Sequence, residues 1–250
     1  MDERALRRLA RDADEQHREA MQTLHNDLAQ AHFGSSDEVS RRERRKFLAR
    51  AAAGGAVMFG ATAVPLSTLL AFNPPAAAQT THSESPSQED IALAQFAQSL
   101  ELAAVAAYRA IDESRILSAA VGETARLFRR HHQEHADALG KILTTAGAEP
   151  ATQPNAALVT LVRTNLQNAR DENEVLKVAY ELEEGAASTY LLAIGRFESA
   201  TIAEAGATIL PVESQHAVVW GQVLDLPEGD YTPAFVDARV AFDPATYPVS

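Results

Sequence analysis

The sequence predicts an all-α protein organised as an antiparallel four-helix bundle, and three observations carry the prediction. Apolar residues recur at helical spacing throughout 88–225, without the sustained alternation that is typical of β-strands. Gly147, Pro150 and Pro154 mark a break between helix-length segments in the middle of this region. A two-helix pattern of acidic and histidine residues also occurs twice within it. The bundle is therefore predicted to be an internally duplicated unit.

The composition limits the chemistry and the partners of the chain. Residues 1–78 carry 11 basic and 10 acidic residues, whereas residues 79–250 carry 11 and 24. The second region offers no basic surface that could neutralise phosphates, which argues against nucleic acid as a partner. There is no cysteine, so disulfides and thiolate metal sites are excluded. A metal would have to be held by His, Asp and Glu, which favours iron, manganese or zinc.

The first predicted helix covers residues 1–33 and ends at the break formed by residues 34–37. Its apolar stripe is thin and rich in alanine, and consists of Leu6, Leu9, Ala13, Ala20, Leu24 and Leu28. We interpret residues 1–40 as an amphipathic leader extension that stays in the cytoplasm. A helix that binds a partner or pairs with itself is the alternative.

Residues 41–78 resemble a twin-arginine (Tat) export signal. Arg44 and Arg45 are followed, after one residue, by Phe47 and Leu48, and then by a weakly hydrophobic run rich in Ala and Gly. The resemblance implies that the Tat export machinery is a partner. It also implies that the folded body is exported to the periplasm or another extracytoplasmic location. A cytoplasmic basic helix is the alternative interpretation.

Two fates of this segment remain open. The run ends in small residues that fit cleavage after Ala78. Without cleavage, residues 51–72 are long enough to span a bilayer and to anchor the protein in the membrane.

The bundle is predicted over residues 88–225, after a Ser-, Thr-, Gln- and Pro-containing linker at 79–87. Ser87 with Asp90 three residues later indicates the start of a helix over 88–113. The second helix is predicted over 120–146 and ends before Gly147. Its inner face is expected to contain Ala125, Phe128, His132, His135, Leu139 and Ile142.

A short helix that starts at Asn155 is predicted to connect the second bundle helix to the third. The third helix is predicted over 171–197 and the fourth over 200–225. Pro211 lies within the fourth helix, where it removes a backbone hydrogen bond and predicts a bend. Residues 226–250 lack a helical period, and we expect an irregular C-terminal tail that wraps the bundle.

The duplicated unit places carboxylates and histidines at matching positions. Glu101 and Tyr108 are seven residues apart, as are Glu183 and Tyr190, so each pair lies on one face of its helix. Glu101 and Glu183 are 82 residues apart. A pair of residues three apart follows each copy, and these two pairs are offset by 81 residues. These pairs are His132 with His135, and Glu213 with His216.

This pattern predicts a metal site inside the bundle. Residues three apart on a helix project from the same side, so each pair can offer two ligands to one point. Inward glutamates on two helices, with a three-spaced pair on each of the other two, are typical of carboxylate-bridged dimetal bundles. The predicted ligands are Glu101, His132, His135, Glu183, Glu213 and His216. Tyr108 and Tyr190 are predicted to hydrogen-bond to these ligands or to take part in one-electron steps.

Two ligand positions have competitors. His131 lies four residues before His135 and competes with His132 as the partner of that ligand. On the third helix, Glu181 and Glu184 compete with Glu183, and only the match to the first copy selects Glu183.

The pattern resembles the ferritin-like superfamily, and in particular exported bacterial ferritin-like domain proteins with a Tat leader. The resemblance covers roughly residues 90–225. It implies that Glu101 and Glu183 are the glutamates of the first and third helices. It likewise implies ligand roles for His135 and for the Glu-x-x-His pair of Glu213 and His216.

One position departs from that family pattern. His132 stands where the family's dimetal site has a glutamate. Three glutamates would then face the four positive charges of two divalent ions, which favours a single ion, or zinc or manganese, over a standard di-iron centre.

Two functions follow from these observations. The first is an exported metal-binding protein that acts as an iron or manganese oxidoreductase or as a metal-handling protein, with one or two ions. The alternative is a non-enzymatic exported helical bundle with a structural or stress-associated role and a degenerate metal site. Both are compatible with a homo-oligomer.

Overall fold

The computed structural model describes residues 1–30, 86–232 and 238–249. Every regular element in these ranges is a helix, which confirms the predicted all-α class. The helices are α1 (Glu3–Gln30), α4 (Gln88–Glu113), α5 (Ala119–Thr145), α6 (Ala156–Asn168), α7 (Glu172–Ile194), α8 (Ala200–Val223) and the one-turn α9 (Glu228–Tyr231). The predicted bundle helices end within three residues of these bounds.

Local sequence signals set several helix ends. At the start of α4 the Ser87 side chain accepts a hydrogen bond from the Asp90 backbone N–H, and the Asp90 carboxylate accepts one from the Ser87 N–H. Asn155 caps α6 through the Leu158 N–H. After α5, Gly147 has a φ of +76°, a left-handed conformation that glycine adopts without strain. These predicted starts and stops are confirmed.

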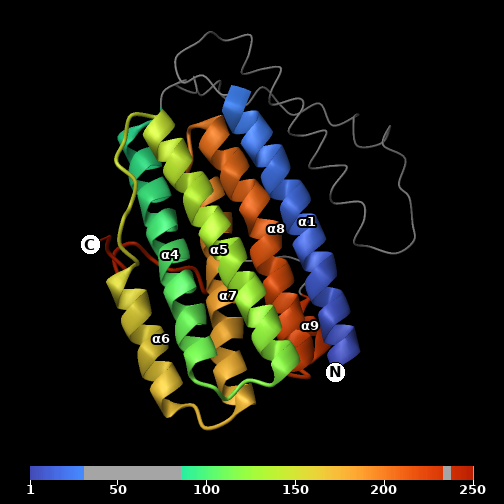
Figure 1. The fold of residues 1–250 in the computed structure, drawn as a ribbon. Coiled ribbons are helices and arrows are strands. Elements are labelled where there is room, and N and C mark those ends of the chain that lie inside the picture. Colours follow the sequence, from blue (N-terminus) through green and yellow to red (C-terminus); the bar gives the residue numbers. More distant parts are fainter. Residues whose placement is uncertain (31–85, 233–237, 250) are drawn as a thin grey trace.

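The four long helices α4, α5, α7 and α8 form the bundle in which the core lies. In Figure 1, α4 and α8 run in the opposite direction to α5 and α7. The segment between α5 and α6 returns along the side of the bundle, and α6 packs against α4 and α7. All six residues predicted for the inner face of α5 are buried. α8 continues through Pro211 without interruption.

α1 is a fifth helix that packs along α5 and α8 (Figure 1). Its buried apolar residues include Leu6, Ala13, Leu24 and Leu28, which belong to the predicted stripe. From the sequence, residues 1–40 are predicted to be separate from the bundle, because the spacing of a thin apolar stripe does not show which surface packs against it. In the structure that surface is the bundle itself.

The C-terminal tail contacts the bundle beyond the short helix α9. Phe242 is buried against α7, and its backbone N–H donates a hydrogen bond to Thr189 Oγ1 at 2.8 Å. The Asn155 side-chain amide donates to the backbone carbonyl oxygens of Tyr247 and Pro248. The tail is thus ordered against the bundle over 238–249.

The predicted export signal lies outside the described residues. This holds for Arg44, Arg45, Phe47 and Leu48, for the proposed cleavage point and for the segment 51–72. Within the described part of the chain, α4 is long and apolar enough to cross a membrane. However, 67% of its apolar window is buried in the bundle, as is common for a core helix of a folded domain.

Candidate metal centre

The six predicted ligands come together in the middle of the bundle. Each of the four bundle helices contributes at least one of them, and each residue is at most 3% exposed. They are Glu101 on α4, His132 and His135 on α5, Glu183 on α7, and Glu213 and His216 on α8. Because the Glu-x-x-His and His-x-x-His spacings are helical, each pair turns both of its side chains toward the bundle axis.

The first half of the cluster contains Glu101, His132, His135 and Glu213. His132 Nδ1 lies 2.8 Å from Glu101 Oε2, and His135 Nδ1 lies 2.8 Å from Glu213 Oε1. One potential ligand atom from each of the four residues lies within 4.8 Å of the others. This is the separation that a single bound cation could bridge.

The second half contains His132, Glu183, Glu213 and His216, and meets the same 4.8 Å criterion. His132 Nε2 lies 3.2 Å from Glu183 Oε1, and His216 Nδ1 lies 3.3 Å from Glu183 Oε2. His132 and Glu213 therefore belong to both halves. The two halves share these residues in the centre, in keeping with the duplicated sequence.

The two tyrosines connect the copies crosswise. Tyr108 on α4 donates a hydrogen bond to Glu183 on α7, and Tyr190 on α7 donates to Glu101 Oε1 on α4 at 2.5 Å. The Trp220 indole N–H donates to the Tyr108 hydroxyl at 2.7 Å. Each tyrosine thus fixes the carboxylate of the other copy, which supports the prediction that both bond to the glutamates.

Opposite charges offset the cost of burial in this cluster. Burial alone would raise the pKa of Glu101, but the charge of His135 and the hydrogen bond from His132 lower it to about 2. Burial would likewise lower the pKa of His135, but Glu101 and Glu213 raise it to about 9. The same balance raises the pKa of His132 and His216 and lowers that of Glu183. Without a metal, the buried carboxylates thus favour the protonated form of the neighbouring imidazoles.

His131 and His132, the two candidate partners of His135 on α5, point in different directions from the helix. His132 faces the carboxylates, whereas His131 is buried on the other side, against α1. There His131 is stacked on His17, with the ring centroids 3.8 Å apart. Burial lowers the pKa of His17 to about 2, and the charges of His135 and His216 add to this effect. On α7, Glu183 is buried and Glu181 is exposed.

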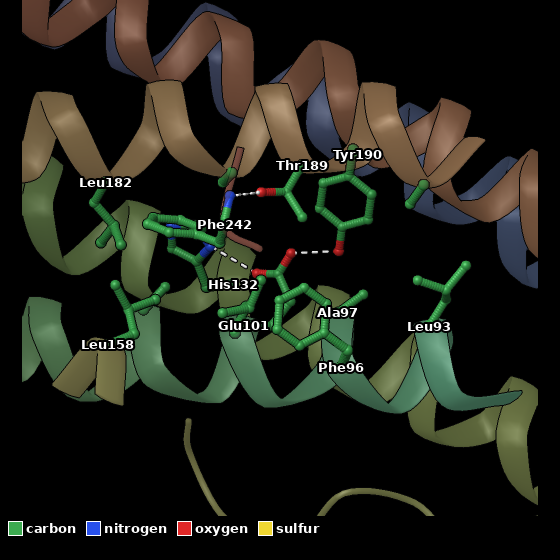
Figure 2. Close-up of a pocket in the computed structure, with 14 residues that line it drawn as sticks. Leu93, Phe96, Ala97, Glu101, His132, Leu158, Leu182, Thr189, Tyr190 and Phe242 are labelled. Carbon is green, nitrogen blue, oxygen red and sulfur yellow. Dashed lines mark hydrogen bonds and ion pairs between the residues drawn. The ribbon is translucent and has the colours of Figure 1, made fainter. Parts of the chain in front are cut away.

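Sequence reasoning missed two contributions to the surroundings of the cluster. The first is the pair Asp14 and His17 on α1, since nothing local in that helix shows that it covers α5. The second is Phe242, which closes a largely apolar cavity of about 20 Å³ between α4 and α7 (Figure 2). Glu101 and His132 lie in the inner wall of this cavity, and Leu93, Phe96 and Leu158 line its apolar part.

The donor set fits a divalent cation. Both carboxylate oxygens of Glu213 are buried without a hydrogen bond, even though His135 Nδ1 is close, because that contact lacks hydrogen-bond geometry. An unbonded buried carboxylate is costly unless a cation or a hydrogen-bond donor satisfies it. Carboxylate oxygens together with imidazole nitrogens are ligands for iron, manganese and zinc.

Comparison with known families gives one match. The model of a ferritin-like domain matches residues 89–226, which is the region from α4 to α8. No curated protein and no solved structure matches the chain. α1 lies outside the matched region.

Proposed function

Because the chain belongs to the family of ferritin-like domains, we propose that it is a metal-handling protein whose bundle holds one or two ions of iron, or of manganese or zinc. The observation that carries the proposal is the pair of four-residue groups that share His132 and Glu213 in the bundle centre. Such a duplicated donor set is difficult to explain by packing alone, since buried glutamates are costly in an apolar core.

The charge balance favours one tightly held ion. Glu101, Glu183 and Glu213 supply three negative charges, whereas two divalent ions would bring four positive charges. His132 lies between Glu101 and Glu183, and its imidazole adds no negative charge. We therefore propose that a second ion, where present, is held more weakly than the first.

We propose that the chain acts as an iron or manganese oxidoreductase, or in metal handling without turnover. Iron or manganese would supply one-electron oxidation and reduction. The protein's own contribution is to keep Glu101 and Glu183 in place through Tyr190 and Tyr108. The aromatic and aliphatic residues around the cluster exclude water from it.

Metal content tests the proposal directly. We expect protein folded in the cell to contain iron, manganese or zinc by elemental analysis, and Glu101→Ala and His216→Ala to lose most of it. Glu181→Ala is the matched control, because Glu181 is exposed on α7 and should leave the metal content unchanged. Equal and negligible metal in the wild type and all variants would refute the proposal.

We also propose that the protein is exported by the Tat machinery and is periplasmic or anchored in the membrane through residues 51–72. The support is the order Arg44-Arg45, Phe47-Leu48 and an uncharged run in the sequence. Replacing both arginines by lysine should retain the protein in the cytoplasm, as measured by cell fractionation. Unchanged fractionation would contradict export by this route.

One observation favours the alternative of a non-enzymatic bundle with a degenerate site. His132 contacts both Glu101 and Glu183, so a protonated imidazole can occupy the centre in place of a cation. In that case added metal would leave the melting temperature unchanged. An increase in the melting temperature with metal that Glu183→Gln abolishes would support the metal-handling function instead.

A further inference from the structure

α1 places two polar side chains, Asp14 and His17, against His131 on the outer side of the candidate metal centre. His131 Nε2 lies 3.3 Å from Asp14 Oδ1, and His131 Nδ1 lies 3.0 Å from His216 Nε2. His216 in turn directs its Nδ1 toward Glu183 and Glu213. A continuous line of contacts therefore runs from Asp14 through His131 and His216 to the centre of the bundle.

The hydrogen-bonding capacity of imidazole determines which atom donates and which accepts at each of these contacts. A carboxylate can only accept a hydrogen bond, so the His131 Nε2–H donates to Asp14. With its single proton on Nε2, the His131 ring has a lone pair on Nδ1. That nitrogen accepts the His216 Nε2–H, and this arrangement leaves His216 Nδ1 free to act as a ligand.

His17 holds the ring of His131 in this orientation. The two rings are stacked at an interplanar angle of 14°, and both residues are at most 1% exposed. Phe128 packs on the adjoining ring of His216 at a centroid distance of 3.8 Å. Neither imidazole can rotate without disturbing packed neighbours.

We propose that α1 completes the metal centre from outside the ferritin-like region, with Asp14 as a positioning residue that acts through His131 on His216. This inference rests on the proposed function, because it assigns a role relative to a bound ion. Partners that orient a metal-bound histidine typically change metal affinity by about 10- to 100-fold when they are removed.

The test uses the full chain and cobalt(II) as a spectroscopic probe, with affinity measured by competition against a chromophoric chelator. We expect Asp14→Ala to weaken binding about tenfold or more and to shift the visible absorption of the bound cobalt. Asp14→Asn should bind nearly as well as the wild type, because its amide oxygen still accepts the His131 N–H. His131→Phe, which keeps a ring against His17, should weaken binding as Asp14→Ala does.

Arg18→Ala is the matched control. Asp14 also forms a partly exposed ion pair with Arg18, at 3.3 Å, and this control removes that pair without touching His131. It should leave both affinity and spectrum unchanged. The proposal is overturned if Asp14→Ala behaves like Arg18→Ala, if Asp14→Asn is as weak as Asp14→Ala, or if His131→Phe binds normally. Failure of the wild type to bind cobalt would overturn the proposed function as well, so the two failures are distinguishable.

Discussion

At the scale of single residues, the crossed tyrosine–glutamate bonds explain how the cluster keeps its shape. Tyr108 and Tyr190 each donate to a buried carboxylate that would otherwise rely on the histidines alone. Burial, together with Glu183 for Tyr108 and Glu101 for Tyr190, raises the pKa of both phenols. The hydroxyl groups therefore remain protonated and act as donors over the physiological range.

We expect Tyr190→Phe to lower the free energy of unfolding by about 2 kcal/mol, since hydrogen bonds to charged groups contribute roughly 1.5–3 kcal/mol. Thr124→Val is the comparison, because the buried Thr124 hydroxyl donates to the neutral backbone oxygen of Ala120 and should contribute about 1 kcal/mol. Urea unfolding of both metal-free variants measures the difference. Equal losses would show that the charge on Glu101 adds nothing to its bond with Tyr190.

Sequence periodicity predicted which acidic and histidine side chains meet inside the bundle, because helical spacing is a local property. Glu213 and His216 share a face whatever surrounds α8, and the duplication selects Glu183 over the exposed Glu181. His131 was harder to place, because α5 has packed neighbours on two sides and both adjacent histidines are buried. Asp14 and His17 contact His131, which is more than 100 residues away in the chain, and no local pattern reports such contacts.

At the scale of elements, the C-terminal tail packs closely on α7 because Gly185 has no side chain. A Cβ atom at Gly185 would overlap the ring of Phe242. Gly185 thus lets the tail approach the helix and close the cavity beside Glu101 (Figure 2). The glycine is needed here for close approach rather than for an unusual backbone conformation.

We expect Gly185→Ala to destabilise the protein by about 1–3 kcal/mol through overpacking, and to displace the tail. The control is Gly195→Ala at the end of α7, where an added Cβ atom would make ordinary contacts at 3.5 Å. Unfolding curves and hydrogen exchange at residues 241–243 report the two effects. Normal protection of these amides in Gly185→Ala would contradict the role of Gly185.

At the scale of the whole molecule, the metal-free protein should become less stable as the pH rises from about 6.5 to 9. The pKa of His135 is raised to about 9 in the folded state, so its stabilising contribution is complete below the unfolded value of 6.5. It is lost as the pH rises through 9. Metal binding requires neutral imidazoles, so metal affinity should increase over the same range, with release of protons.

Urea midpoints in the presence of a chelator, together with titration calorimetry in two buffers, test this dependence. His135→Gln should flatten the fall in stability between pH 6.5 and 9. His25→Ala should keep the wild-type profile, because His25 is exposed on α1. A wild-type midpoint that does not change with pH in this window would contradict the assignment.

The position of α1 in the chain has a consequence for the proposed export. α1 precedes residues 41–78, whereas the bundle follows them. A leader that crosses a membrane once would leave α1 and the bundle on opposite sides of it. Cleavage after Ala78 would make α1 and the bundle separate polypeptides. The five-helix assembly requires α1 and the bundle to lie on the same side of a membrane. Export by the proposed route would therefore remove the contacts that α1 makes with α5 and α8.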